Sequence, residues 1–196
     1  MTFLILANDS AFRETAVRDA RRAFLGKSGL LLSGAAVALL AGQDALAKGD
    51  KSAASDVRIL NSALGAELEA IAAYQVGAES GLLQKPVFDL AVSFQGHHKE
   101  HADVLSKTIV KLGGKAVSAK SKYAFPTEAL NNQTDVLRFA ASLEKGAVSA
   151  YLGAVPLFDN RDLAKAAASI LGDEAMHWAI LRNALGEPPV PSAFVS

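Results

Sequence analysis

Three of the four histidines of this chain lie within five positions, in the stretch GHHKEHADVL, as His97, His98 and His101. The fourth, His177, follows Glu174 by three positions in the stretch GDEAMHWAIL. Residues three positions apart share one face of a helix, so two such side chains can bind the same ion. Imidazole nitrogens and carboxylate oxygens together suit iron, manganese or zinc. The spacing therefore indicates a metal site built on two helices.

Two further carboxylates lie on the apolar faces of two other segments. Glu67 is followed by Tyr74, and the same pair returns in the second half of the chain as Glu144 and Tyr151. An ionised carboxylate is costly to bury alone, so these groups need either a metal or a hydrogen-bond network that satisfies every member. We predict six metal ligands: Glu67, His98, His101, Glu144, Glu174 and His177.

Tyr74 and Tyr151 lie two helical turns beyond Glu67 and Glu144. From these positions each tyrosine could donate a hydrogen bond to a ligand or relay one electron to a metal. The alternative is an ordinary core aromatic whose hydroxyl is satisfied elsewhere. The sequence leaves both interpretations open.

The remaining polar residues near the histidines do not fit the ligand pattern. His97 lies one position off the apolar face. We therefore expect it to be solvated, or to contact a metal-ligating side chain without binding the metal itself. Glu100 points to a different face, and Glu69 is predicted to lie on the surface. The run HHKEH lacks the glutamate that must follow the first histidine of the zinc-protease helix motif, which argues against that class.

Apolar residues recurring at steps of three and four predict four helices to carry these side chains. The expected ranges are 54–83, 86–113, 135–158 and 161–185. The first and last connections are short, whereas residues 115–134 form a long connection. This pattern predicts an all-α four-helix bundle with one crossover between the second and third helices.

The N-terminal residues have the features of a secretory signal. The pair Arg21-Arg22 precedes an apolar run, and Ala45 and Ala47 form a small-residue cleavage site. We therefore predict that residues 1–47 are a signal peptide of the twin-arginine type, cleaved after Ala47, and that residues 48–196 form one periplasmic domain. The apolar run is shorter than a membrane-spanning helix, so no stable membrane anchor is expected after cleavage.

Composition narrows the classes of partner. The chain carries 20 basic and 20 acidic residues, so nothing in its charge favours binding to nucleic acid. It has no cysteine, which excludes disulfides, thiolate metal sites and thiol nucleophiles. The expected partner is a metal ion, and the length suits a monomer or a homodimer equally.

Glu144 on one helix and Glu174-x-x-His177 on the next resemble the ferritin-like superfamily, in particular the exported bacterial ferritin-like domain proteins. The resemblance extends over about residues 55–186. It implies a di-iron carboxylate site, with one Glu from each of two helices and Glu-x-x-His from the other two. It also implies iron or manganese, or alternatively zinc, as the metal.

His98 departs from this pattern because the superfamily usually has glutamate there. Imidazole binds a metal through one nitrogen and does not bridge two ions as a carboxylate does. The chain could therefore hold two ions unequally, one ion bound by Glu144, Glu174 and His177, or none. The corresponding functions are an oxidoreductase acting on dioxygen or peroxide, a non-catalytic periplasmic metal-binding module, and a metal-free structural or stress-related bundle.

Overall fold

Four long helices account for most of residues 51–195, which are the residues that the computed structural model describes. The predicted signal peptide, residues 1–47, lies outside them. No strand occurs between residues 51 and 195, so the all-α prediction is confirmed. The elements are α3 (Lys51–Glu79), α4 (Lys85–Lys111), η1 (Thr127–Ala129), α5 (Gln133–Ala154), η2 (Val155–Leu157) and α6 (Arg161–Ala184).

Local chemistry explains where these helices begin and end. α4 starts with a proline in its first turn, and the side chains of Asn132 and Asn160 accept backbone N–H groups at the starts of α5 and α6. α3 ends at Glu79, earlier than predicted, and Gly81 follows in a left-handed conformation with φ 70°. The α5 helix also ends early, because Pro156 falls in a short 3-10 turn.

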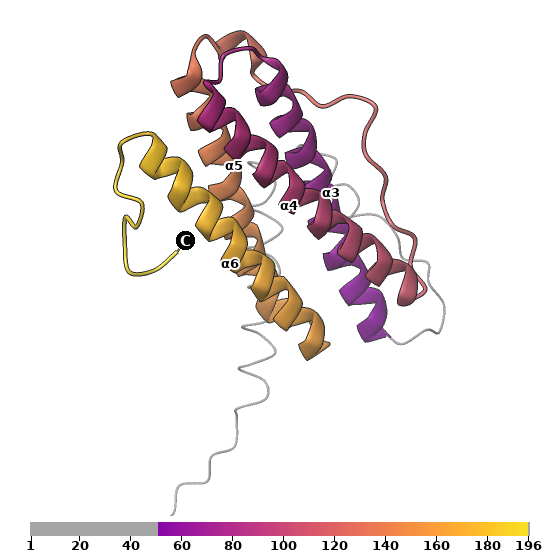
Figure 1. Cartoon of the computed structure of the whole chain (residues 1–196). Helices are drawn as coiled ribbons and strands as arrows, with labels where there is room; N and C mark the ends of the chain where they lie inside the picture. The colour runs from indigo at the N-terminus through magenta and orange to yellow at the C-terminus, as the bar shows by residue number, and fades with distance from the viewer. Residues whose placement is uncertain (1–50, 196) are drawn as a thin grey trace, which may run out of the picture.

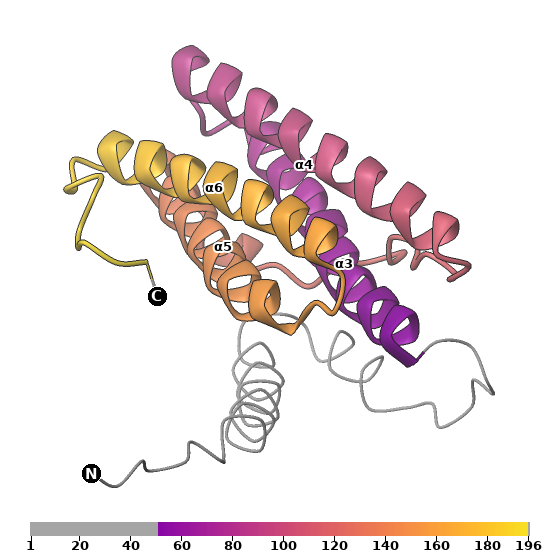
Figure 2. The same ribbon diagram turned by 90° about the horizontal axis from the view of Figure 1, so that it is seen from below.

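The helices pack as two antiparallel pairs, α3 with α4 and α5 with α6 (Figures 1 and 2). The segment between α4 and α5 runs back along the length of the bundle, so that these two helices point the same way (Figure 1). The predicted four-helix bundle with one long crossover is therefore confirmed. The two pairs meet chiefly through α3 and α5.

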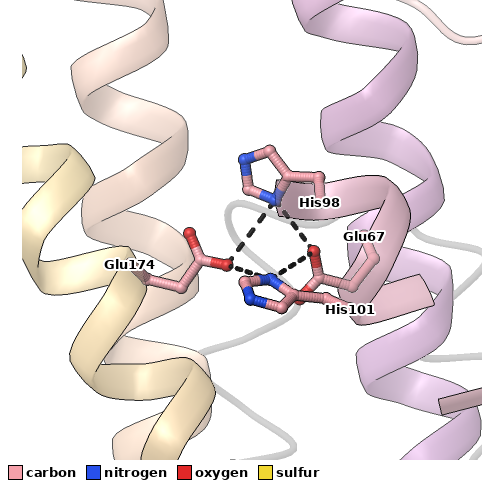
Figure 3. Close-up of side chains that lie close together, drawn as sticks. All are labelled: Glu67, His98, His101 and Glu174. Carbon is pink, nitrogen blue, oxygen red and sulfur yellow. Dashed lines mark hydrogen bonds and ion pairs between the residues drawn. The ribbon is translucent and has the colours of Figure 1, made fainter. Parts of the chain in front are cut away.

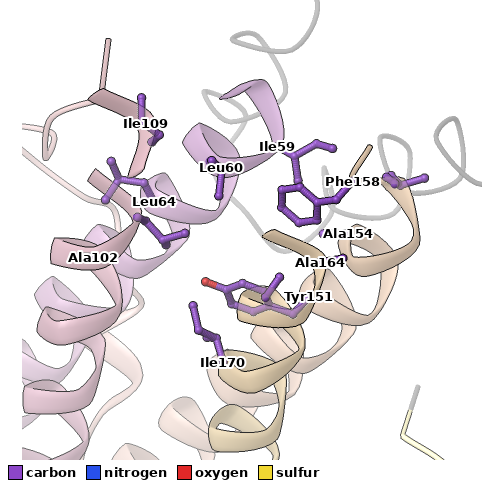
Figure 4. Packing of buried hydrophobic residues seen from close by; sticks show 13 residues of the cluster. Ile59, Leu60, Leu64, Ala102, Ile109, Tyr151, Ala154, Phe158, Ala164 and Ile170 are labelled. Atoms are coloured by element: carbon purple, nitrogen blue, oxygen red, sulfur yellow. The ribbon is translucent and has the colours of Figure 1, made fainter. Parts of the chain in front are cut away.

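Two apolar clusters fill the bundle on either side of a polar level. The larger one includes Leu64, Ile109, Phe158 and Ile170, which point inward from all four helices or the turns beside them (Figure 4). The smaller one is formed by Tyr74, Phe94, Leu137, Ala141 and Leu181. Apolar packing above and below removes water from the side chains between the clusters, which raises the cost of leaving any of them unpaired.

Two buried or half-buried polar residues of α3 attach the connections to the bundle. Asp56 accepts the backbone N–H groups of Asp159 and Asn160, each at 2.9 Å, and so ties the α5–α6 turn to α3. Asn61 donates to the carbonyl of Lys115 at 3.0 Å and accepts the N–H of Val117 at 2.8 Å, which holds the start of the crossover. None of the described helices combines the length and apolar character needed to cross a membrane.

Candidate metal centre

All six predicted ligands meet at one level of the bundle, and each helix contributes at least one. α3 carries Glu67, α4 carries His98 and His101, α5 carries Glu144, and α6 carries Glu174 and His177. Five of the six are at most 2% exposed, and His101 is partly buried. Their donor atoms form two groups, each compact enough to surround one ion.

The first group, here called the α3 cluster, consists of Glu67, His98, His101 and Glu174 (Figure 3). His98 Nδ1 lies 2.8 Å from Glu67 Oε2 and 3.5 Å from Glu174 Oε1. His101 Nδ1 lies 3.6 Å from the same Glu67 oxygen and 3.1 Å from the same Glu174 oxygen. Four donor atoms thus converge, with Glu174 reaching across from α6 (Figure 3).

The second group, the α5 cluster, consists of His98, Glu144, Glu174 and His177. Glu144 Oε1 lies 3.3 Å from His98 Nε2 and 3.6 Å from His177 Nδ1. His177 Nδ1 is also 3.3 Å from Glu174 Oε2. All four of these residues are buried.

His98 and Glu174 belong to both clusters, and each uses different atoms in the two. Glu174 directs Oε1 to the α3 cluster and Oε2 to the α5 cluster, as a bridging carboxylate does. His98 directs Nδ1 to the first and Nε2 to the second. A neutral imidazole has only one lone pair, so His98 in that form can bind an ion in one cluster at a time.

The two tyrosines cross between the halves of the bundle. Tyr74 of α3 donates its hydroxyl to Glu144 Oε1 of α5. Tyr151 of α5 donates to Glu67 Oε1 of α3 at 2.5 Å. Both rings are buried, so each tyrosine holds the carboxylate on the opposite helix in place.

Comparison with known proteins agrees with this geometry. A family model described as "Ferritin-like domain" matches residues 55–187, which is well over half of the chain. The chain belongs to the ferritin-like domain family.

One solved structure similar to this ferritin-like domain is that of a conserved hypothetical protein, rv2844, from Mycobacterium tuberculosis. It has 23% sequence identity and a TM-score of 0.63, and the match covers 72% of this chain and 97% of that one. At this identity the likeness shows the fold alone. No curated protein matches the chain.

The three glutamates of the ferritin-like domain differ in the direction in which their pKa values are shifted. Burial alone would raise the pKa of Glu67, but contacts with His101 and His98 outweigh it and hold this pKa below 4.5. Burial likewise opposes ionisation of Glu144, and contacts with His177 and His98 hold its pKa well below the usual range. The pKa of Glu174 is raised, because burial and the neighbouring carboxylates outweigh its two histidines.

The histidines respond to the same carboxylates. Burial would lower the pKa of His98, but contacts with Glu144 and Glu67 raise it to about 11. The pKa values of His101 and His177 rise to about 9 for the same reason, against the same opposing effect of burial. Burial and the adjacent carboxylates also raise the pKa of Tyr74 and Tyr151 well above 10, so both hydroxyls keep their protons at neutral pH.

Several donor atoms at the centre of the site lack hydrogen bonds. Their chemistry and placement indicate whether these residues fit a metal ion. Within residues 51–195, His101 Nδ1, His177 Nδ1, Glu144 Oε2 and both oxygens of Glu174 make none. Buried polar atoms are normally paired, and four of these five, all except Glu144 Oε2, face other donor atoms of the two clusters. Nitrogen and oxygen donors converging in this way fit a divalent first-row metal.

Asp173 and His97 were not among the predicted ligands, yet both contact them. Asp173 Oδ2 lies 3.4 Å from His101 Nε2 and 3.2 Å from His177 Nε2, so it can accept a hydrogen bond from the outer N–H of each ring. His97 Nδ1 lies 2.9 Å from His177 Nε2. A contact of His97 with a predicted ligand was one of the two arrangements expected from the sequence, whereas Asp173 was missed. Aligning GHHKEH with GDEAMH pairs His97 with Asp173, and this correspondence could have revealed Asp173.

The other two acidic residues lie apart from both clusters. Glu100 is exposed and belongs to neither of them, as the helix periodicity predicts. Glu69, expected on the surface, is instead partly buried, because it lines a cavity between α3 and α5.

This cavity has a volume of about 290 Å³ and reaches the candidate metal centre. Small side chains of the two helices leave the space open, including Ala63, Ala66, Ala70, Gly146, Ala147 and Ala150. Glu67, His98 and Glu144 also line it. A small molecule could therefore approach the ligands from this side of the bundle without displacing a helix.

Proposed function

We propose that this ferritin-like domain protein is exported, binds two iron or manganese ions in the α3 and α5 clusters, and acts as an oxidoreductase on dioxygen or a peroxide. The observation that carries the proposal is the pair of buried four-residue groups that share His98 and Glu174. Three carboxylates and three imidazoles at one level of a core are expensive to bury unless they share protons or bind cations.

The residues of the chain have distinct roles in this proposal. Glu174 would bridge the clusters, and Glu67 and Glu144 would each serve one of them, held by a tyrosine from the opposite helix. The cavity between α3 and α5 would admit a small oxidant while the surrounding apolar core excludes bulk water. The bound metals would supply the redox chemistry, and the protein the geometry around them.

Export to the periplasm is part of the proposal and rests on the sequence of residues 1–47. The arginine pair, the apolar run and the small-residue cleavage site occur there in the order typical of a twin-arginine signal.

A non-catalytic metal-binding module is the second candidate, and the contacts of His98 favour it. This ring lies between Glu67 and Glu144, at 2.8 Å and 3.3 Å, and as a cation it would neutralise part of their charge without a second metal. The α5 cluster would then hold one ion through Glu144, Glu174 and His177. A metal-free structural bundle would need every one of these groups to be satisfied by protons alone.

The shared position of Glu174 makes the proposal testable by elemental analysis. We expect about two iron or manganese ions in the processed wild-type protein purified without a tag from cells supplied with iron, manganese and zinc. Glu174→Gln removes a ligand from both clusters, so both ions should be lost. Glu67→Gln removes a ligand from the α3 cluster only, so about one ion should remain.

Glu100→Gln is the matched control, because it removes the same charge from an exposed position outside both clusters. Metal content equal to wild type in the Glu174 variant would show that the site assignment is wrong. One ion in the wild type, especially zinc, would favour the binding module. Two ions that do not change oxidation state with peroxide or dioxygen would argue against the oxidoreductase.

A further inference from the structure

Three donor atoms converge on the outer side of the α5 cluster. Asp173 Oδ2 lies 3.2 Å from both His97 Nδ1 and His177 Nε2, and the two nitrogens are 2.9 Å apart. These distances form a nearly equilateral triangle. One proton between the two nitrogens can satisfy only one edge of it, whereas a single cation can contact all three donors at once.

The exposure of these three side chains decreases from the solvent towards the core. His97 is 43% exposed at its side chain, Asp173 24% and His177 2%. The His177 ring stacks on Phe94 with centroids 4.0 Å apart and on the His97 ring with centroids 5.1 Å apart. Phe94 thus restrains the orientation of the ring, with Nε2 towards the outer triangle and Nδ1 towards Glu144 and Glu174.

His177 therefore links an outer group of donors to an inner one. Because neutral imidazole has one lone pair, His177 can bind a cation through Nε2 or through Nδ1, but not through both. An ion held outside would give up this ligand when another occupies the α5 cluster. Because an outer ion and an ion in the α5 cluster compete for His177, the outer donors suit a site that an ion occupies briefly better than a permanent third site.

We propose that His97, Asp173 and His177 form an outer binding site for a divalent transition-metal cation, from which the ion passes to the buried clusters. This proposal rests on the proposed metal-binding function and adds a route of entry to it. Two imidazoles and one carboxylate match the donor preference of Fe²⁺, Co²⁺ and Zn²⁺. The negative charge of Asp173 at a partly exposed position would attract such ions from solvent.

The test is the rate of cobalt(II) uptake by the processed protein, measured by stopped-flow absorbance after mixing with cobalt(II) chloride. In the wild type we expect an early absorbance change from the outer site, followed by a slower one as the buried clusters fill. His97→Ala should remove the early phase and slow filling about tenfold, while the final cobalt content stays the same. Glu100→Ala, an exposed position on the same helix, should behave as wild type.

Each other outcome decides against the proposal. If His97→Ala takes up cobalt at the wild-type rate, the outer site is wrong and the proposed function stands. If the final cobalt content of His97→Ala falls, His97 belongs to the buried sites rather than to an entry route. A thermal melt of His97→Ala and the milder His97→Gln variant distinguish this result from misfolding. If the wild type takes up no cobalt, iron, manganese or zinc, the outer site and the proposed function fail together.

Discussion

At the scale of single residues, His98 determines how far this centre differs from a symmetric carboxylate site. Its two nitrogens face carboxylates of opposite helices, Glu67 on α3 and Glu144 on α5. With a pKa of about 11, the ring is a cation at neutral pH when no metal is present. It thereby neutralises charge that metal ions would otherwise balance.

Replacing His98 with glutamate should reverse this balance. His98→Glu places a third anion between Glu67 and Glu144, so the metal-free protein should melt at a lower temperature, whereas the affinity for a second ion should rise. Thermal melts with and without manganese, together with elemental analysis, measure both effects. His98→Gln is the control, because it removes the cation without adding a carboxylate. A metal-free protein that melts at the same temperature after His98→Glu would contradict this account.

The metal-free protein should also lose stability as the pH rises above neutral. The pKa of His98 is about 11 in the folded state against 6.5 ordinarily, so its charged form stabilises the fold fully below pH 6.5. That contribution decreases above pH 6.5 and is lost as the pH passes 11. His101 and His177, each with a pKa of about 9, act in the same direction over a narrower range.

Urea unfolding of chelator-treated protein between pH 6 and 10 measures this dependence. The His98→Gln variant should show a flatter profile, because it lacks the group with the largest shift. Metal binding should show the opposite trend and tighten as the pH rises, since His101 and His177, with pKa values of about 9, and His98, with a pKa of about 11, must release their protons to bind an ion. Wild type and His98→Gln with equal slopes would exclude His98 as the source.

At the scale of the elements, polar side chains of α3 hold the connections that determine which helices become neighbours. Asp56 is 2% exposed and accepts two backbone N–H groups at the turn between α5 and α6. Asn61 holds the beginning of the crossover by donating to the carbonyl of Lys115 and accepting the N–H of Val117. The Asp56 contacts join α3 to the turn between α5 and α6 and so help to position the second helical pair against the first.

Removing the Asp56 carboxylate should destabilise the fold without changing the metal ligands. Asp56→Ala leaves the N–H groups of Asp159 and Asn160 without their carboxylate acceptor, which we expect to cost about 1–3 kcal/mol of unfolding free energy. Asp103→Ala is the control, because Asp103 makes an exposed ion pair with Lys107 and its loss should change stability by less than about 1 kcal/mol. Equal unfolding midpoints in urea for the two variants would contradict the role assigned to Asp56.

At the scale of the whole molecule, the candidate metal centre joins all four helices. Every helix contributes at least one ligand, so an ion bound there crosslinks both pairs, which otherwise meet chiefly through α3 and α5. The unfolded chain does not hold these ligands together, and metal binding therefore favours the folded state.

Metal should consequently raise the melting temperature in a concentration-dependent way. At free metal about a hundredfold above its dissociation constant, one site adds about 2.7 kcal/mol to the unfolding free energy. A chelator should reverse the increase. Glu174→Gln should melt at the same temperature with and without metal, because both clusters lose a ligand. Stabilisation of that variant equal to wild type would indicate binding elsewhere on the surface.

The helices and the six buried or half-buried residues that meet in the two clusters were readable from the sequence, because both depend on periodicity within one segment. Steps of three and four separate the buried face of a helix from its exposed face, which selected Glu67 and His98 and set Glu100 aside. The internal repeat added that the two halves carry equivalent polar residues. Helix ends were less accurate, because α3 and α5 finish at turns whose backbone conformation periodicity does not determine.

Contacts between helices were decided only by the tertiary structure. Periodicity says which face of a helix is buried, whereas the rotation and crossing of two helices depend on how the whole core packs. That packing directs Tyr74 to Glu144 rather than to Glu67 on its own helix, and gives His98 one nitrogen in each cluster. It also brings Asp173 to the outer nitrogens of two ligand histidines, because the α4 and α6 faces meet at that level.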